Sequence, residues 1–203
     1  MKRVRGGLLV LWLAGVAAAD PAPMSAGGQP TPSTSGTVRL AREELTIDVD
    51  LKAAAVRALL FLENAGAAQA LTLGFPCGDA ALSCRAKVTV TLDGKRATVR
   101  RKGKYFLWPM KIAAGGKVAV EVRYRSPLVN ERYETPYYGM GALTYKLTTG
   151  AAWAGPIGEL VMTVRVPTNA VLYVSPAGAV RTSGTVSWNL KDIEPQGDLA
   201  LFF

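Results

Sequence analysis

The chain has 203 residues, of which 49% are apolar and 19% are charged, and its net charge is +9 with no histidine. A chain of this length and composition can bury a core of its own, which excludes an intrinsically disordered protein. The absence of histidine excludes serine–histidine and cysteine–histidine nucleophiles, imidazole general bases and most transition-metal sites. The composition therefore favours a protein that is not an enzyme and that holds no cofactor and no metal.

Residues 1–19 have the pattern of a bacterial signal peptide. Three cations precede a short apolar run at residues 8–16, and Ala17 and Ala19 form an A-x-A cleavage site. The run is shorter than the ~18–20 residues that a membrane-spanning helix needs, and no later segment approaches that length. We therefore expect an exported protein, periplasmic or extracellular, that begins at Asp20, has no transmembrane span and carries a net charge of +6.

Residues 20–36 are rich in proline, serine, threonine and glycine, and they hold almost no large apolar side chain. Such a segment buries too little surface to offset the entropy lost on ordering, so a linker is expected here.

Residues 37–203 consist of short apolar-rich runs separated by Gly and Pro turns, and in several of these runs apolar and polar residues alternate with period two. This pattern predicts one all-β domain, a single antiparallel β-sandwich, immunoglobulin-like or jelly-roll-like, with roughly 10–12 short strands. Residues 56–62 and 70–75 are expected to pair through a turn at residues 64–66. The expected strands lie at residues 45–50, 56–62, 70–75, 117–125, 142–147, 160–166, 171–174, 186–190 and 199–203, together with the two arms of a hairpin.

The hairpin is predicted at residues 87–100, where Asp93 and Gly94 separate two alternating runs. Asp-Gly is the signature of a two-residue type I′ turn, whose register fixes the pairs along both arms. Continued to its end, that register places Lys87 opposite Arg100, and two cations facing each other repel slightly.

Residues 85–104 carry eight cations and only one acid, Asp93, so their local charge of +7 exceeds the +6 of the expected mature chain. Clustered positive charge attracts polyanions, with an affinity that falls as ionic strength rises. In an exported protein the expected partners are an anionic envelope polymer, anionic lipid head groups or an acidic protein, and not nucleic acid. The alternative is an edge hairpin whose Lys and Arg prevent aggregation. The binding hypothesis assigns contacts to Arg96, Arg100, Arg101, Lys102 and Lys104.

A second group of candidate residues, between positions 131 and 153, combines aromatic rings with carboxylates. Tyr and Trp beside acids are typical of glycan-binding platforms, where rings stack on sugars and carboxylates accept hydroxyl protons. The alternative is core packing, above all for Tyr145 in an alternating strand and for Trp153. Glu131 and Glu134 supply the two carboxylates that a glycoside hydrolase needs, although nothing in the sequence fixes their separation. The glycan-binding candidates are Tyr133, Tyr137 and Tyr138.

Cys77 and Cys84 are the two cysteines of the chain. In an exported protein, two cysteines this close in sequence are predicted to form a disulfide, worth roughly 2–3 kcal/mol on the chain-entropy model. Their spacing is not C-x-x-C, and no further thiol or imidazole is present to complete a zinc site, so a redox or metal role is disfavoured.

The segment from Thr149 to Gly158 reads TGAAWAGPIG and resembles the TGxxWxGPIG signature of a bacterial exported family of unknown function. Weaker similarities at residues 38–47, 64–66, 74–76 and 192–199 extend this resemblance over nearly all of residues 37–203. The resemblance implies a secreted β-rich domain and assigns no catalytic or binding residue.

The signature residues also have a physical interpretation that does not depend on any family. Residues 155–158 fit a turn that has Pro156 at its second position and Gly158 at its fourth. Trp153 is large enough to seal one end of a sandwich. A structural role is therefore favoured over ligand contact for Trp153, Gly155, Pro156 and Gly158.

The sequence leaves three functions open. The favoured one is a non-enzymatic binding or interaction module of the cell envelope or extracellular space, whose ligand is an anionic polymer, a glycan or an acidic protein. The alternative is a purely structural accessory domain of the envelope. The least favoured is a carboxylate-based glycoside hydrolase.

Overall fold

The computed structural model describes residues 36–50, 52–77, 85–127, 142–167, 171 and 173–202, with the backbone of two short strands at residues 16–19 and 22–23. Within these residues the chain forms sixteen strands and one 3-10 turn, and no α-helix. The predicted all-β class is therefore confirmed. The strands outnumber the roughly 10–12 expected, because five of them are only two or three residues long and too short to show an alternation. None of the described segments is a helix that could cross a bilayer.

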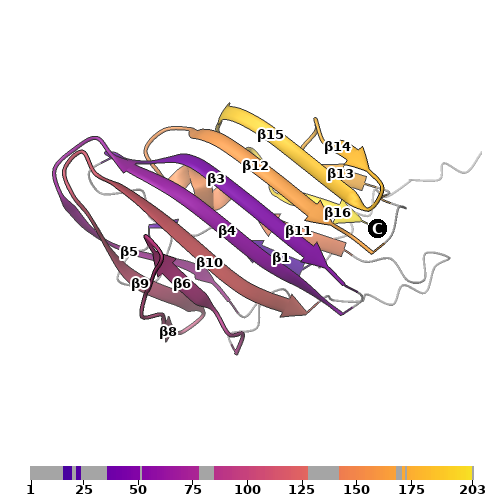
Figure 1. The fold of residues 1–203 in the computed structure, drawn as a ribbon, viewed down its shortest axis with the longest axis horizontal. Helices are drawn as coiled ribbons and strands as arrows, with labels where there is room; N and C mark the ends of the chain where they lie inside the picture. Colours follow the sequence, from indigo (N-terminus) through magenta and orange to yellow (C-terminus); the bar gives the residue numbers. More distant parts are fainter. Residues whose placement is uncertain are drawn as a thin grey trace, which may run out of the picture.

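The largest sheet contains eight strands in the order β14-β15-β12-β3-β4-β10-β6-β7 (Figure 1). Neighbouring strands are antiparallel except β3 and β12, which run parallel, so the sheet is mixed. Its strands are β3 (Val38–Val49), β4 (Ala53–Asn64), β6 (Thr89–Leu92), β7 (Lys95–Arg96), β10 (Lys117–Pro127), β12 (Ile157–Arg165), β14 (Val180–Thr182) and β15 (Thr185–Ile193).

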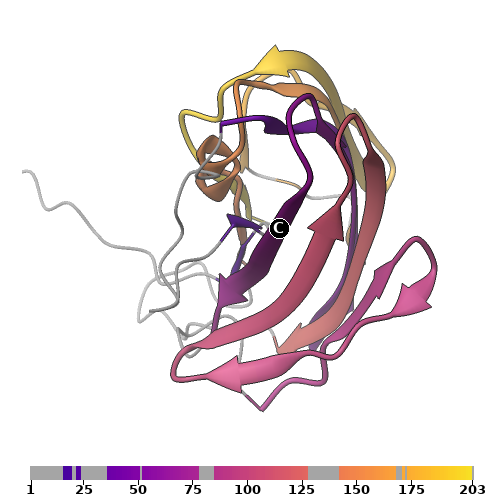
Figure 2. The same cartoon turned by 90° about the vertical axis from the view of Figure 1, so that its left-hand side faces the viewer.

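Two four-stranded sheets lie against the large sheet, which curves around them when seen from its end (Figure 2). The first, in the order β2-β5-β9-β8, contains β2 (Ala22–Pro23), β5 (Gln69–Pro76), β9 (Tyr105–Ile112) and β8 (Arg100–Lys102). The second, in the order β1-β11-β16-β13, contains β1 (Val16–Ala19), β11 (Ala142–Lys146), β16 (Leu199–Phe202) and β13 (Tyr173–Ser175), and the 3-10 turn η1 (Thr148–Ala152) follows β11.

Strands β1 and β2 fall within the predicted leader and linker. β1 runs parallel to β11, and β2 pairs with β5 at the edge of its sheet. Cleavage after Ala19 would remove β1, and that cleavage stays a prediction.

The buried side chains form a single core between the sheets. The alternation expected on β10 is confirmed, because Val120, Val122 and Tyr124 point inward and are 0%, 1% and 6% exposed. Phe75 of β5 joins the layers, since its ring lies 5.5 Å from that of Tyr124 and 5.9 Å from that of Trp108 between ring centres. Pairs of this geometry stabilise a core beyond the area that they bury.

The connection between β4 and β5 is a corner between two sheets and not a hairpin. β4 pairs with β3 and β10, whereas β5 pairs with β9 and β2, so the predicted pairing of residues 56–62 with 70–75 is wrong. Asn64, 2% exposed, explains the corner. Its amide nitrogen donates to the carbonyl oxygens of Ala67 (2.7 Å) and Ala113 (2.9 Å). Ala113 belongs to the connection from β9 to β10, so one side chain joins two corners that lie side by side (Figure 2).

Candidate functional site

The Asp93-Gly94 turn of the basic hairpin forms as predicted. Both residues have positive φ, 48° and 77°, which is the type I′ geometry. Arg96 lies opposite Thr91, and Lys95 lies opposite Leu92. The pairing of the two arms continues for one residue beyond β7, since the backbone N–H of Ala97 donates to the carbonyl oxygen of Val90 (2.9 Å). The hairpin is therefore shorter than predicted.

Beyond β7 the chain leaves β6 and crosses to another sheet. β6 stays beside β10, whereas Arg100 in β8 pairs with Leu107 of β9. Lys87 therefore does not lie opposite Arg100, and that prediction is wrong. The connecting residues Ala97 and Val99 are half-buried and pack against the core, which draws the chain across the edge. The segment thus connects the large sheet to the sheet that contains β9.

All eight cations of residues 85–104 are exposed, and we call them the basic surface. Asp93, the one acid in the segment, forms no ion pair with them among the described residues, and its carboxylate accepts a hydrogen bond from the backbone N–H of Ala119 (2.8 Å). Among the described residues, six of these cations have no carboxylate within 4.0 Å. They are Lys87, Lys95, Arg96, Arg100, Arg101 and Lys104.

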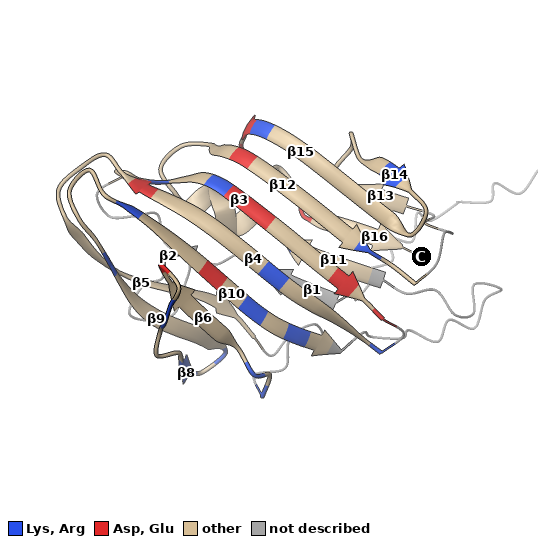
Figure 3. Ribbon diagram, in the orientation of Figure 1, with Lys and Arg blue, Asp and Glu red and all other residues tan. Residues whose placement is uncertain are grey.

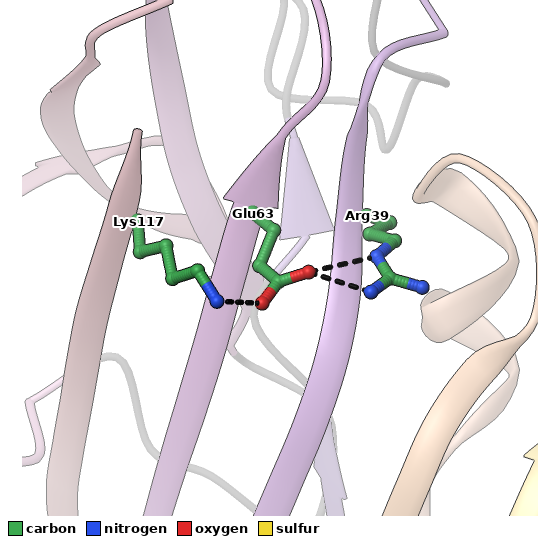
Figure 4. Close-up of polar contacts among 3 residues, drawn as sticks. All are labelled: Arg39, Glu63 and Lys117. Atoms are coloured by element: carbon green, nitrogen blue, oxygen red, sulfur yellow. Dashed lines mark hydrogen bonds and ion pairs between the residues drawn. The ribbon is translucent and has the colours of Figure 1, made fainter. Parts of the chain in front are cut away.

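Cations of β3, β4, β10 and β12, the central strands of the large sheet, have the opposite arrangement. Glu63 lies between Arg39 and Lys117, 2.6 Å from a nitrogen of each (Figure 4). Acidic and basic positions lie beside each other on neighbouring strands among β3, β4, β10 and β12 (Figure 3). The other pairs are Arg42 with Glu44 and Glu159, Arg57 and Arg123 with Glu121, Arg125 with Asp50, and Arg165 with Asp48.

Two of these carboxylates, Glu63 and Glu121, have a pKa that their cationic partners lower. Hydrogen bonds from Lys117 and then Arg39 hold the pKa of Glu63 below its ordinary value. The guanidinium of Arg123, with a smaller contribution from Arg57, lowers the pKa of Glu121 in the same way. Positive charge on these strands is therefore compensated locally, whereas on the basic surface it is not.

The aromatic candidates divide into two groups. Tyr145 and Trp153 are 0% and 4% exposed, so the core-packing interpretation is confirmed for these two. The glycan-binding candidates Tyr133, Tyr137 and Tyr138 lie outside the described residues, as do Glu131 and Glu134.

The predicted disulfide is described at one end only. Cys77 is buried, and its backbone N–H donates to the carbonyl oxygen of Lys104 (2.7 Å) at the end of the basic segment. Cys84 lies outside the described residues, so the bridge stays a prediction.

Trp153 is buried, whereas Gly155 and Pro156 are exposed in the bend that leads into β12. Gly155 has a φ of 69°, and the chain bends over residues 153–156. The turn predicted at residues 155–158 is therefore displaced, because β12 already begins at Ile157. Gly158 lies against an irregularity in β3, where a Cβ atom would come within 2.5 Å of the carbonyl oxygen of Ala41. These contacts fit the expected structural role.

A depression of about 460 Å³, which was not predicted from the sequence, lies beside the basic surface. It is lined by Arg100, Arg101 and Lys102 of β8, by residues 107–109 of β9 and by Thr72 of β5. Strand β9 was not among the expected strands because Pro109 interrupts its apolar run, and a proline argues against a strand. The only sequence signal for the depression was therefore its cationic rim.

Carboxylates elsewhere also have partners. The Asp198 carboxylate accepts hydrogen bonds from the backbone N–H and the hydroxyl of Thr148, at 3.3 and 2.9 Å, which fixes the exit of β11. In the part of the chain that the structure describes, no group of three or more Cys, Asp or Glu side chains is placed to hold a metal ion.

No protein-family model matches the chain, and neither does any curated protein. The fold does match solved structures. One is a candidate nutrient binding protein from Legionella pneumophila, which is 18% identical over 93% of this chain and 71% of that one, with a TM-score of 0.73. Yeast LTA4 hydrolase is 11% identical, with a TM-score of 0.53, and the match covers 89% of this chain but only 31% of the hydrolase. At these identities the likeness shows a shared fold.

Proposed function

We propose that this protein is a non-catalytic binding module of the bacterial envelope or extracellular space, and that its basic surface binds an anionic polymer. One observation carries the proposal. Every Lys and Arg of β3, β4, β10 and β12 is paired with a carboxylate, whereas six of the eight cations of the basic surface have no carboxylate partner among the described residues. The shared fold of the Legionella protein, whose name assigns it a binding role, supports a binding function as well.

Electrostatics gives the expected behaviour of such a surface. Uncompensated cations gathered on one edge produce a local positive potential that concentrates polyanions near it. The interaction is screened by salt, with a Debye length of ~30 Å at about 10 mM and ~8 Å at about 150 mM salt. The predicted export directs the proposal toward polymers of the envelope or of its surroundings.

The experiment is retention of the full chain on immobilised polyphosphate and polygalacturonate at about 10 mM salt. The double variant Arg96→Glu/Arg100→Glu removes two cations of the basic surface and adds two acids. The matched control Lys52→Glu/Lys191→Glu makes the same change in net charge at exposed positions outside that surface. Substitutions at such exposed positions usually shift stability by no more than about 0.5 kcal/mol, so both variants should fold.

The wild type and the control should be retained, and the hairpin variant should elute unretained. Equal loss in both variants would attribute retention to net charge alone and contradict the proposal. An unretained wild type at low salt would also contradict it, and would favour the purely structural accessory role.

A further inference from the structure

The depression beside the basic surface lies where one strand ends and its neighbour continues. β8 pairs only with residues 105–107 of β9, so within the described residues Trp108 and Pro109 extend past its end. The depression of about 460 Å³ opens at this point, and we call it the notch. Ligand sites in proteins measure roughly 300–1,000 Å³, so the notch suits one small unit of a longer ligand.

The strand register gives the chemistry of the notch. Thr72 lies opposite Pro109, and Arg100 lies opposite Leu107. Residues opposite each other share one face of a sheet, so a hydroxyl, a guanidinium and two apolar side chains are presented together. An apolar patch packs against the C–H face of a sugar ring, a hydroxyl bonds to a ring hydroxyl, and a guanidinium pairs with a carboxylate.

The core closes the notch from below. Trp108 also lines the notch, but successive side chains of β9 point to opposite faces, and Trp108 is 1% exposed and packs against Phe75 in the core. A ligand in the notch therefore contacts β9 through the outward side chains of Leu107 and Pro109.

We infer that the notch holds one acidic sugar unit of an anionic polysaccharide, with its carboxylate at Arg100 and its ring against Leu107 and Pro109. This inference rests on the proposed function and names the ligand class. A polymer without rings, such as polyphosphate, meets the basic surface but leaves the apolar part of the notch empty. The full chain should therefore bind polygalacturonate about tenfold more tightly than polyphosphate of equal charge.

The test follows the methyl signals of Leu107 by NMR of the isotope-labelled full chain, titrated with digalacturonate. The methyl signals of Leu107 should shift, and those of Leu190 in β15 should stay in place as an internal reference. Titration with polyphosphate should leave both sets of methyl signals unchanged while the backbone signals of the hairpin move. Stationary Leu107 methyl signals at digalacturonate saturation would overturn the inference.

A filling variant gives a second, independent readout. Thr72→Tyr places a ring in the notch at an exposed strand position, where aromatic residues are tolerated, and leaves the charge unchanged. It should reduce polygalacturonate binding about tenfold to the level of polyphosphate, whose binding it should not change. Thr182→Tyr, at an exposed position of β14, is the matched control and should retain the preference.

The outcomes separate the two proposals. Polyphosphate and polygalacturonate that bind equally well to the wild type would overturn the sugar assignment and leave the proposed function standing. A different result would be that phosphatidylglycerol vesicles retain the protein more tightly than polygalacturonate does, and still do so in Thr72→Tyr. This result would assign the basic surface to lipid head groups and would also overturn the sugar assignment. Failure of both polymers to bind would contradict the proposed function itself.

Discussion

Replacing Gly158 by alanine tests the contact between the signature segment and the central strand β3. A Cβ atom at this position would lie 2.5 Å from the carbonyl oxygen of Ala41, whereas real Cβ contacts essentially never fall below 3.0 Å. The obstructing atom belongs to the backbone of β3, and its neighbours Leu40 and Arg42 are both paired with β4, so the contact is relieved only if the strand shifts. Overpacking of this kind costs about 1–3 kcal/mol, and a rigid obstacle places Gly158→Ala in the upper half of that range.

Urea unfolding followed by circular dichroism measures the loss in the free energy of unfolding. For a loss of about 2–3 kcal/mol in a domain of this size, the melting temperature in a thermal scan should fall by about 4–12 °C. Gly197→Ala is the matched control, because no atom lies within 4 Å of its added Cβ. It should stay within about 0.5 kcal/mol of the wild type. Ala41→Gly should not rescue Gly158→Ala, since the clash is with a main-chain oxygen. If Gly158→Ala unfolds at the same urea concentration as Gly197→Ala, the close approach of β12 to β3 is not as described.

Three further predictions concern the core, the ion pairs and the cysteines. Trp153→Ala should lower the free energy of unfolding by roughly 3–5 kcal/mol, because it removes a large buried ring. Trp153→Phe should lower it by clearly less, because the indole N–H has no partner among the described residues. A small effect of Trp153→Ala on stability combined with lost ligand binding would refute the core role of Trp153. The pKa values of Asp50, Glu63 and Glu121 lie below their unfolded values; for Asp50 the causes are the backbone N–H groups of Lys52 and Ala53 and then Arg125. The stabilisation that these carboxylates contribute is complete above the unfolded pKa of about 4 and is lost as the pH falls through the folded pKa. The urea midpoint should therefore drop on acidification below about pH 4, less steeply in Glu121→Gln, and a midpoint that rises there would contradict these pairs. Intact mass of the exported protein should show residues 1–19 removed and two hydrogens lost to a bridge between Cys77 and Cys84, whereas two reactive thiols in the native protein would exclude the bridge.

Features set by neighbouring residues were predictable from the sequence. Asp93 and Gly94 give a type I′ turn because the turn chemistry is local. The inward side chains of β10 follow from a period-two pattern, and the burial of Tyr145 and Trp153 follows from their size and setting.

Features that depend on distant partners were not predictable. β12 lies parallel to β3, and the ion pair between Arg42 and Glu159 joins residues 117 positions apart. The corner at Asn64 resembles a hairpin turn in sequence, but β4 and β5 pair with partners in different sheets, and Asn64 is bonded to the distant residue Ala113. Pro109 hid β9, and the structure accommodates this proline because it lies past the end of β8. The notch was missed together with β9, since two of its three walls come from β9 and β5.

The salt dependence of polyphosphate binding tests the central claim most directly. Affinity should be measured by titration of the full chain from about 10 to about 150 mM salt, where the Debye length falls from ~30 to ~8 Å. Binding to the basic surface predicts a steep linear fall of log affinity with log salt, a shallower slope in Arg96→Glu/Arg100→Glu and an unchanged slope in Lys52→Glu/Lys191→Glu. An affinity that does not change with salt, or equal slopes in the wild type and the hairpin variant, would contradict it.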